Sequence, residues 1–330
     1  MKQGLLLTPG AARAAYQVGA VEVLVKEGGL RFDVIAASSV GALNGGFVAT
    51  GQVERLAELW GGWKTRDILG PDWGTLLRGA VLWAPNLMHN RPQKENVIYP
   101  HLQESRLLPG VRFRFNLANL TGGRQEVFEW PGAPISLAEG VNASVAVPAA
   151  IRPAELLGSQ YADGLTIDGF AAEALILGTG IERLFIVGVA PRSPETSRLR
   201  SAYGVMLRAM EINQYSETHL GIRRAREANA LIRAWEEDRR QIEEAFSAVP
   251  DVKKREALLT EAADIYAGSG FPYSRPAVEL ITILPQRSTP MFFTNYQPRR
   301  SRALLDEGRR DARLVLAELE KESSRTEAGD

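Results

Sequence analysis

The sequence predicts an α/β fold with a largely parallel central sheet. Gly4–Leu7 is a short apolar run, Arg13–Glu27 carries apolar residues at helical spacing, and Phe32–Ala37 is a second apolar run without Gly or Pro. A strand, a helix and a strand joined by short turns form a βαβ unit, whose strands are parallel with a right-handed crossover. A helix built largely of Gly and Ala, Gly41–Ala49, follows directly, and its small residues allow close packing on the sheet.

Later segments supply the remaining elements. Val111–Leu120 alternates apolar and polar residues, and Gln125–Trp130 follows it after Thr121-Gly122-Gly123, which predicts a β-hairpin. The other expected elements are helices at Gln52–Trp63, Ser136–Ala146, Ala171–Gly178, Ser201–Val249 and Ser301–Leu319, and strands near Gln160–Ala162, Ile181–Val189 and Ala277–Leu284. The long helix Ser201–Val249 combines an apolar stripe with charge runs, which we interpret as solvated faces.

Composition excludes several classes of function. The chain has 330 residues, 45% of them hydrophobic, which is ample for a large core. Lys+Arg and Asp+Glu both number 39, so the formal net charge is zero and does not favour binding to nucleic acid or to an anionic membrane. The absence of cysteine excludes disulfides, thiolate metal sites and a cysteine nucleophile.

The sequence shows no membrane-crossing segment. No apolar stretch reaches the roughly 18 residues of a membrane span, and the apolar run at the amino terminus is short and soon meets Arg13. We therefore expect a cytoplasmic protein without a secretory signal.

The candidate nucleophile is Ser39, in the string Ala37-Ser38-Ser39-Val40-Gly41. A serine between a buried strand and a helix exposes its hydroxyl at the carboxyl edge of the sheet, where the helix N-terminus directs its free N–H groups. This is the arrangement of a nucleophile elbow, G-x-S-x-G, with Ala37 in place of the first glycine and Gly41 retained. A serine at such a junction is also a common helix N-cap, so other residues must decide between the two roles.

A serine nucleophile needs a base. The three histidines, His89, His101 and His219, all lie away from the ends of the expected core strands, so a Ser–His–Asp triad has little support. A carboxylate is the other choice. Asp163-Gly164 and Asp168-Gly169 both qualify, although an Asp-Gly pair is most often a turn, and the residues alone do not choose between them.

Three blocks of the chain resemble the bacterial patatin-like phospholipases, which are lipid acyl hydrolases with a Ser–Asp dyad. Leu5–Leu24 is similar to that family's first strand, oxyanion loop and first helix, and Phe32–Ala49 is similar to its elbow. Val141–Pro148, followed by Tyr161-Ala162-Asp163-Gly164, resembles its approach to the catalytic Asp-Gly. The resemblance weakens after about Gly169.

The resemblance implies a single domain over residues 1–330 with a three-layer α/β/α sandwich. Helical excursions are expected at about 52–108 and 201–268, with a C-terminal helix at about 301–319. Carried over to this chain, the family pattern makes Ser39 the nucleophile and Asp163 the base, with Gly41 and Gly164 as supporting motif residues. Asp168 is set aside. This chemistry requires no metal and no cofactor.

The oxyanion loop departs from the family pattern. The family has G-G-G-x-R-G, whereas this chain reads Pro9-Gly10-Ala11-Ala12-Arg13-Ala14. Proline has no N–H to donate, and alanine is penalised wherever the loop needs a positive φ. An oxyanion hole nevertheless needs N–H groups rather than glycines, and Gly10, Ala11 and Val40 can each supply one. Arg13 is expected to orient the loop or to meet a phosphate, unless it is simply an exposed residue of the first helical turn.

The preferred hypothesis is a serine lipid acyl hydrolase that acts on a lipid or acyl-ester substrate, with contact to a membrane surface through apolar insertion. The aromatic segments Met291–Phe293 and Pro71–Pro85 are candidates for a lipid-facing rim, and core burial is the alternative for them. A second hypothesis is a weak or inactive family member that binds an acyl ligand or a protein partner. A nucleotide-binding βαβ protein is a third, but Pro9–Arg13 contains neither phosphate-binding glycine motif.

Overall fold

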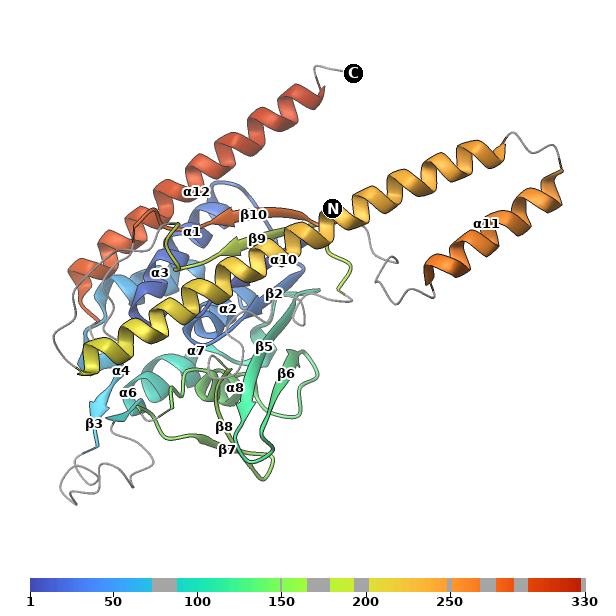
Figure 1. Ribbon diagram of the computed structural model, residues 1–330. Coiled ribbons are helices and arrows are strands. Elements are labelled where there is room, and N and C mark those ends of the chain that lie inside the picture. Colours follow the sequence, from blue (N-terminus) through green and yellow to red (C-terminus); the bar gives the residue numbers. More distant parts are fainter. Residues whose placement is uncertain are drawn as a thin grey trace.

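An eight-stranded mixed sheet forms the centre of the protein, seen in a computed structural model (Figure 1). The structure describes residues 1–72, 88–148, 150–164, 179–192, 202–247, 251–267, 277–287 and 296–327. The strand order is β10-β9-β1-β2-β5-β8-β7, and β6 also pairs with β5. These strands are β1 (Gln3–Leu7), β2 (Val34–Ala37), β5 (Arg112–Asn119), β6 (Arg124–Trp130), β7 (Ala154–Leu156), β8 (Ser159–Asp163), β9 (Arg183–Val187) and β10 (Glu279–Ile283).

Most of the sheet is parallel. From β10 to β5 every neighbouring pair runs in the same direction, and Leu7 of β1 lies opposite Ala37 of β2. The expected βαβ unit and the expected β5–β6 hairpin are both present. The antiparallel pairs β5–β8 and β8–β7 complete the other end of the sheet, where the sequence indicated only a short run near residues 160–162. The α/β fold class is therefore confirmed.

Helices cover both faces of the sheet. Alternate strand residues separate the two faces, because Leu5 and Leu7 join one apolar cluster and Leu6 joins the other. The first cluster includes residues of α1, α2, α3, α8 and α12, and the second includes Ile222 of α10, which crosses in front of the sheet in Figure 1. The longer helices are α1 (Ala15–Lys26), α2 (Val40–Ala49), α3 (Val53–Gly62), α8 (Leu137–Ser144), α10 (Ala202–Ser247), α11 (Val252–Ala267) and α12 (Pro298–Glu327).

Short elements occupy the segment before β5, which the sequence left irregular. They are α4 (Thr65–Ile68), β3 (Gly70–Pro71), β4 (Met88–His89), α6 (Arg91–Gln93), η2 (Lys94–Ile98), α7 (Tyr99–His101) and η3 (Glu104–Arg106). Residues 73–85 and 291–293, which the lipid-facing rim would use, lie outside the described residues, as do Asp168 and the helix expected at 171–178.

The helices expected within the described residues are present, and the C-terminal one differs in length. Ser136 caps α8, because its hydroxyl accepts a hydrogen bond from the Glu139 N–H and the Glu139 carboxylate accepts one from the Ser136 N–H. The C-terminal helix is longer than the expected 301–319, because α12 continues to Glu327. None of the helices in the described part of the chain has the combined length and apolar character that crossing a bilayer requires.

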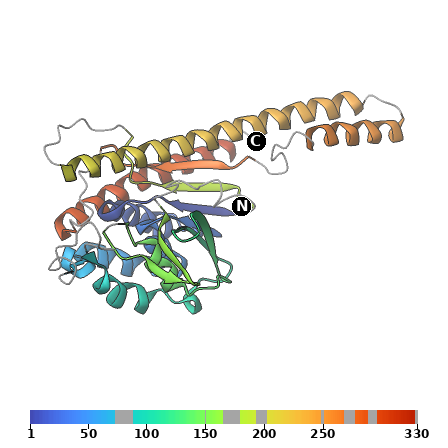
Figure 2. The ribbon, with the colours of Figure 1, turned by 60° about the horizontal axis from the view of Figure 1, so that its bottom comes forward.

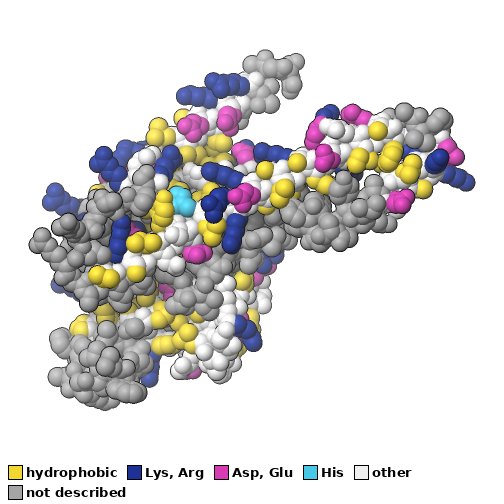
Figure 3. Space-filling model, in the orientation of Figure 1, with side chains coloured by type: hydrophobic (Ala, Val, Ile, Leu, Met, Phe, Trp, Pro, Cys, Tyr) yellow, Lys and Arg dark blue, Asp and Glu magenta, His cyan; other side chains and the backbone are white. Residues whose placement is uncertain are grey.

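The second half of α10 projects beyond the sheet, with α11 beside it (Figures 1 and 2). Exposed ion pairs such as Arg240–Glu237 confirm that the charge runs of this helix are solvated. Figure 3 shows hydrophobic side chains along the same projection, between charges of both signs. The apolar stripe is thus divided: Ile232 is buried, whereas Leu231 is 53% exposed.

Helices α1 and α12 approach each other at two glycines. A Cβ on Gly19 of α1 would collide with the backbone of Leu305, and a Cβ on Gly308 of α12 would collide with the backbone of Tyr16. The two helices can therefore pack this closely only because neither carries a side chain at the crossing.

We expect Gly19→Ala to lower the free energy of unfolding by about 1–3 kcal/mol, because the new methyl group forces the two helices apart. Gly61→Ala in α3 is the matched control, since its Cβ would meet nothing nearer than 3.9 Å. The control should gain up to about 1 kcal/mol from helix propensity. Urea denaturation of both variants measures the difference, and equal effects at the two positions would contradict this account of the packing.

Candidate active site

The candidate active site lies where β2 and β8 meet along one edge of β5. β6 pairs with β5 from Phe113 to Asn119 and so occupies one edge of that strand. β2 and β8 must therefore share the other edge, because a strand has only two. β2 ends opposite Phe115 and β8, running the other way, ends opposite Leu117. The carboxyl ends of the two strands consequently point at each other, and the residues that follow them are brought together.

Ser39 forms the turn between β2 and α2. Its φ of 57° and ψ of −135° are unusual for a residue with a side chain, and such strain is often found at functional sites. Ser39 occupies the N-cap position, but its hydroxyl does not cap the helix. Gly41 is required two residues later, because a Cβ there would lie 2.6 Å from the carbonyl oxygen of Leu7. The close approach of α2 to β1 that the small residues predicted is thus present.

The Ser39 hydroxyl donates a hydrogen bond of 2.6 Å to Oδ2 of Asp163. Both residues are buried, with 3% of Ser39 and none of Asp163 exposed, so bulk water does not compete for this bond. The Asp163 N–H donates to the carbonyl of Ala146, just beyond α8. Gly164 is also needed as a glycine, because a Cβ there would lie 2.7 Å from the Asn116 carbonyl oxygen. The structure therefore joins two side chains that are 124 residues apart in sequence.

Three backbone N–H groups lie in the turns beside Ser39. Val40 begins α2, and Gly10 and Ala11 follow β1, which is paired with β2 up to Leu7 and Ala37. Within the described part of the chain, the N–H groups of Gly10, Ala11 and Val40 donate no hydrogen bond. Ala11 has a φ of 45°, so the loop does require the left-handed conformation at a position occupied by alanine.

A buried polar network that the sequence did not indicate supports both turns. Asn44 of α2 donates to the Ala14 carbonyl and to Gln17, both at 3.1 Å, and accepts from the Trp60 indole N–H at 2.9 Å. Gln17 in turn donates to the Thr8 carbonyl at 2.6 Å. These bonds tie the helix after Ser39 to the loop after β1. Polar residues inside apolar helices were the only available signal of this network.

Arg13 is buried rather than exposed, with 3% of the residue accessible. Its guanidinium donates to Glu211 at 3.1 Å and to Oε1 of Gln214 at 2.6 Å, both on α10. Arg208 also pairs with Glu211, at 2.7 Å. Burial lowers the pKa of Arg13, while Glu211 opposes that shift. The carboxylate of Glu211 is therefore the counter-charge for the buried guanidinium.

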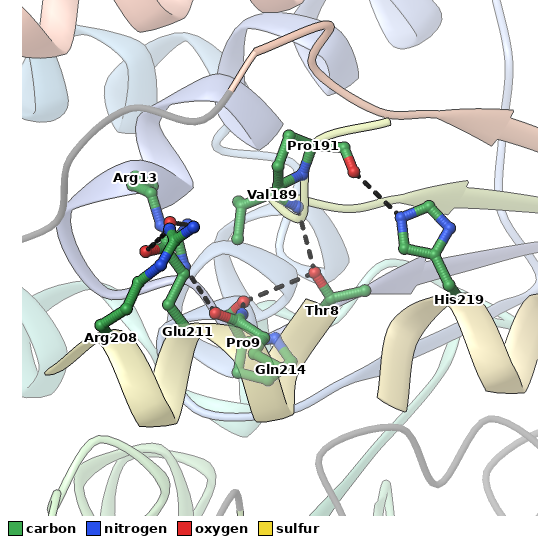
Figure 4. Close-up of polar contacts among 9 residues, drawn as sticks. All are labelled: Thr8, Pro9, Arg13, Val189, Pro191, Arg208, Glu211, Gln214 and His219. Atoms are coloured by element: carbon green, nitrogen blue, oxygen red, sulfur yellow. Dashed lines mark hydrogen bonds and ion pairs between the residues drawn. The ribbon is translucent and has the colours of Figure 1, made fainter. Parts of the chain in front are cut away.

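The histidines take part in other contacts. His219 contacts the Pro191 carbonyl at 2.9 Å, as Figure 4 shows, and His101 contacts Gln52 at 3.1 Å. His89 pairs with Gly70 in the small β3–β4 sheet. In the parts of the chain that the structure describes, no group of three or more His, Asp and Glu side chains is arranged to hold a metal ion.

We expect Glu211→Ala to lower the free energy of unfolding by about 3–5 kcal/mol, because it leaves Arg13 buried without its counter-charge. Glu237→Ala is the matched control on the same helix, since its pair with Arg240 is exposed and should leave the denaturation midpoint nearly unchanged. Guanidinium denaturation followed by circular dichroism measures both. A loss no larger for Glu211→Ala than for the control would contradict the role of this buried pair.

The comparisons with known proteins agree with the resemblance in the sequence. The model of the family described as patatin-like phospholipase matches residues 5–176, a segment that contains both Ser39 and Asp163. A crystal structure of VipD from Legionella pneumophila has a similar fold, with a TM-score of 0.51 and 14% sequence identity, over 96% of this chain and 67% of the VipD chain. No curated protein sequence matches the chain. The chain belongs to the patatin-like phospholipase family.

Proposed function

We propose that this protein is a serine lipid acyl hydrolase with Ser39 as nucleophile and Asp163 as general base. Membership of the patatin-like phospholipase family supports lipid acyl hydrolysis as the general activity. The observation that carries the specific assignment is the 2.6 Å hydrogen bond from the Ser39 hydroxyl to Asp163. A hydroxyl becomes a competent nucleophile when an adjacent base can take its proton, and this bond provides the path.

Acylation begins when Ser39 Oγ attacks the carbonyl carbon of a fatty acyl ester while its proton passes to Asp163 Oδ2. The carbonyl oxygen becomes an oxyanion, which the N–H groups of Gly10, Ala11 and Val40 are proposed to receive. As the tetrahedral intermediate collapses, the alcohol leaves with the proton held by Asp163. The product of this half-reaction is an acyl ester on Ser39.

Deacylation repeats the same steps with water in place of serine. Asp163 takes a proton from the attacking water, and the hydroxide adds to the acyl carbonyl. Collapse of this second intermediate expels Ser39 Oγ, which recovers its proton from Asp163, and releases the fatty acid. No step in this sequence draws on a group other than the two side chains, the N–H donors and water.

The altered loop is proposed to retain enough donors for this chemistry. Pro9 supplies no N–H, but Gly10, Ala11 and Val40 each have one that no described residue accepts. Loss of a single oxyanion donor typically costs about 2.7–4 kcal/mol of transition-state stabilisation. A loop with one donor fewer would thus be slower without being inactive.

The proposed substrate is a fatty acyl ester presented at a lipid surface. The zero formal net charge makes apolar insertion, rather than bulk electrostatic attraction, the proposed form of contact with that surface. The segments 73–85 and 291–293 that would provide such contact lie outside the described residues.

We expect purified protein to react with a fluorophosphonate at Ser39 and to hydrolyse a short-chain p-nitrophenyl ester. Ser39→Ala should abolish labelling, and Ser39→Ala and Asp163→Asn should each lower kcat by about 10⁴–10⁶-fold, because they remove the nucleophile and its base. Ser38→Ala is the matched control in the same turn and should keep both labelling and turnover.

Two outcomes would contradict the proposal. Labelling that persists in Ser39→Ala would assign the reactive serine elsewhere. No labelling of a wild-type protein that unfolds cooperatively would favour the alternative, a family member that binds an acyl ligand or a partner without turnover. Binding of a fluorescent fatty acid, measured by anisotropy, then tests that alternative directly.

A further inference from the structure

The direction of the Gly10 N–H depends on what holds the Pro9 carbonyl. These two groups belong to one peptide unit, which is planar and trans, so its C=O and N–H point in opposite directions. Proline fixes its own φ but leaves its ψ free, and glycine has no Cβ to restrict its φ. A concerted rotation about the Cα–C bond of Pro9 and the N–Cα bond of Gly10 turns the Gly10 N–H away with little movement of the rest of the chain. A partner on the Pro9 carbonyl is therefore needed to keep the N–H in place.

Gln214 of α10 is that partner (Figure 4). Its Nε2 donates to the Pro9 carbonyl, and its Oε1 accepts from the Arg13 guanidinium at 2.6 Å. A guanidinium can only donate and a carbonyl can only accept, so a single orientation of the Gln214 amide satisfies both neighbours. Gln214 is 5% exposed, and water therefore does not compete for either bond.

The neighbouring peptide is held locally instead. The Gly10 carbonyl, which shares a peptide unit with the Ala11 N–H, accepts from the Arg13 N–H at 3.0 Å within the same short turn. Among the described residues, the Pro9–Gly10 unit has no such turn bond, and its other contact is a long one of 3.5 Å from the Thr8 hydroxyl. Of the two candidate oxyanion donors after β1, Gly10 is the one whose direction is set from another element.

Helix α10 is well fixed at this point. Thr218 and Ile222 are buried one and two turns beyond Gln214, and His219 contacts the Pro191 carbonyl after β9. The pairs that Glu211 makes with Arg13 and Arg208 lie one turn before it. The helix thus provides a rigid support for the Gln214 amide.

We propose that Gln214 is a positioning residue that holds the Gly10 N–H towards the oxyanion, so that the activity of the altered loop depends on α10. The inference rests on the proposed function, because it assigns a purpose to the Gly10 donor. Gln214 touches neither the substrate nor Ser39, and it acts only through the Pro9–Gly10 peptide. In a loop that has lost glycines and gained a proline, this side chain supplies the restraint from outside.

Gln214→Glu is the sharpest test, because it keeps the size of the side chain and an acceptor for Arg13 but replaces the donor to Pro9 with a second oxygen. We expect kcat for a p-nitrophenyl ester to fall by about 10²–10³-fold, the usual effect of losing one oxyanion donor. Affinity for a trifluoromethyl ketone, which forms an oxyanion adduct with the serine, should fall in parallel. Affinity for the corresponding alkyl ether, which has no carbonyl, should stay the same.

Two further variants control for the added negative charge and for a failure of Gln214→Glu to fold. Gln241→Glu makes the same change at an exposed position on the same helix and should behave as wild type. Gln214→Met removes both bonds without adding charge, and should reproduce the loss in kcat if Gln214→Glu fails to fold. A kcat within threefold of wild type in a folded Gln214 variant, or an equal loss of ether binding, would overturn the proposal.

A crystal structure of the Gln214 variant separates this inference from the proposed function. We expect the Pro9–Gly10 peptide to be rotated or to adopt more than one orientation, whether or not the wild type turns over substrate. An unchanged peptide overturns the positioning role. A rotated peptide in a protein whose wild type is inactive supports the positioning role and contradicts the proposed function.

Discussion

The arrangement of the site depends on how many strands one edge of β5 must accommodate. Because β6 takes the other edge from Phe113 to Asn119, β2 and β8 have to share what remains, and they run towards each other. Their carboxyl ends meet between the levels of Phe115 and Leu117, and the turn after β2 places Ser39 against the last residue of β8. The hydrogen bond between Ser39 and Asp163 is thus a consequence of backbone pairing, which is more rigid than a contact between two loops.

A buried guanidinium imposes the second constraint. Arg13 lies in the short helical turn Ala11–Ala14 after β1 and is removed from water, so it needs a counter-charge, which Glu211 provides from α10. The same region of α10 brings Gln214 to the Pro9 carbonyl. The first half of this helix is therefore tied both to the apolar face of the sheet and to the loop beside Ser39. Its second half is held by hydrogen bonds between Asn229 and the backbone of Val278, and the helix then projects with α11 (Figure 2).

Local patterns predicted the elements around the site well, because each pattern has a short-range cause. The apolar runs of β1 and β2, the small residues of α2 and the hairpin turn after β5 all appear where expected. Asp163 was harder to predict as the base, because an Asp-Gly pair is most often a turn and Asp168-Gly169 has the same pattern. The resemblance to the patatin-like phospholipases, rather than periodicity, chose Asp163. One alternative for Arg13 was an exposed residue of the first helical turn, which its burial excludes. Gln214 and Glu211 carried no local signal of their contacts.

The sequence by itself determined the fold class, the sharp serine turn followed by Gly41, and the loss of one loop donor to proline. These follow from residue type and spacing, which act over a few residues. Only the tertiary structure showed that the Asp163 carboxylate lies within hydrogen-bond distance of the Ser39 hydroxyl, and that a glutamine some 200 residues away holds the Pro9 carbonyl. Such contacts depend on strand register and on how a helix docks, and these are set by packing over the whole sheet rather than by any neighbouring residue.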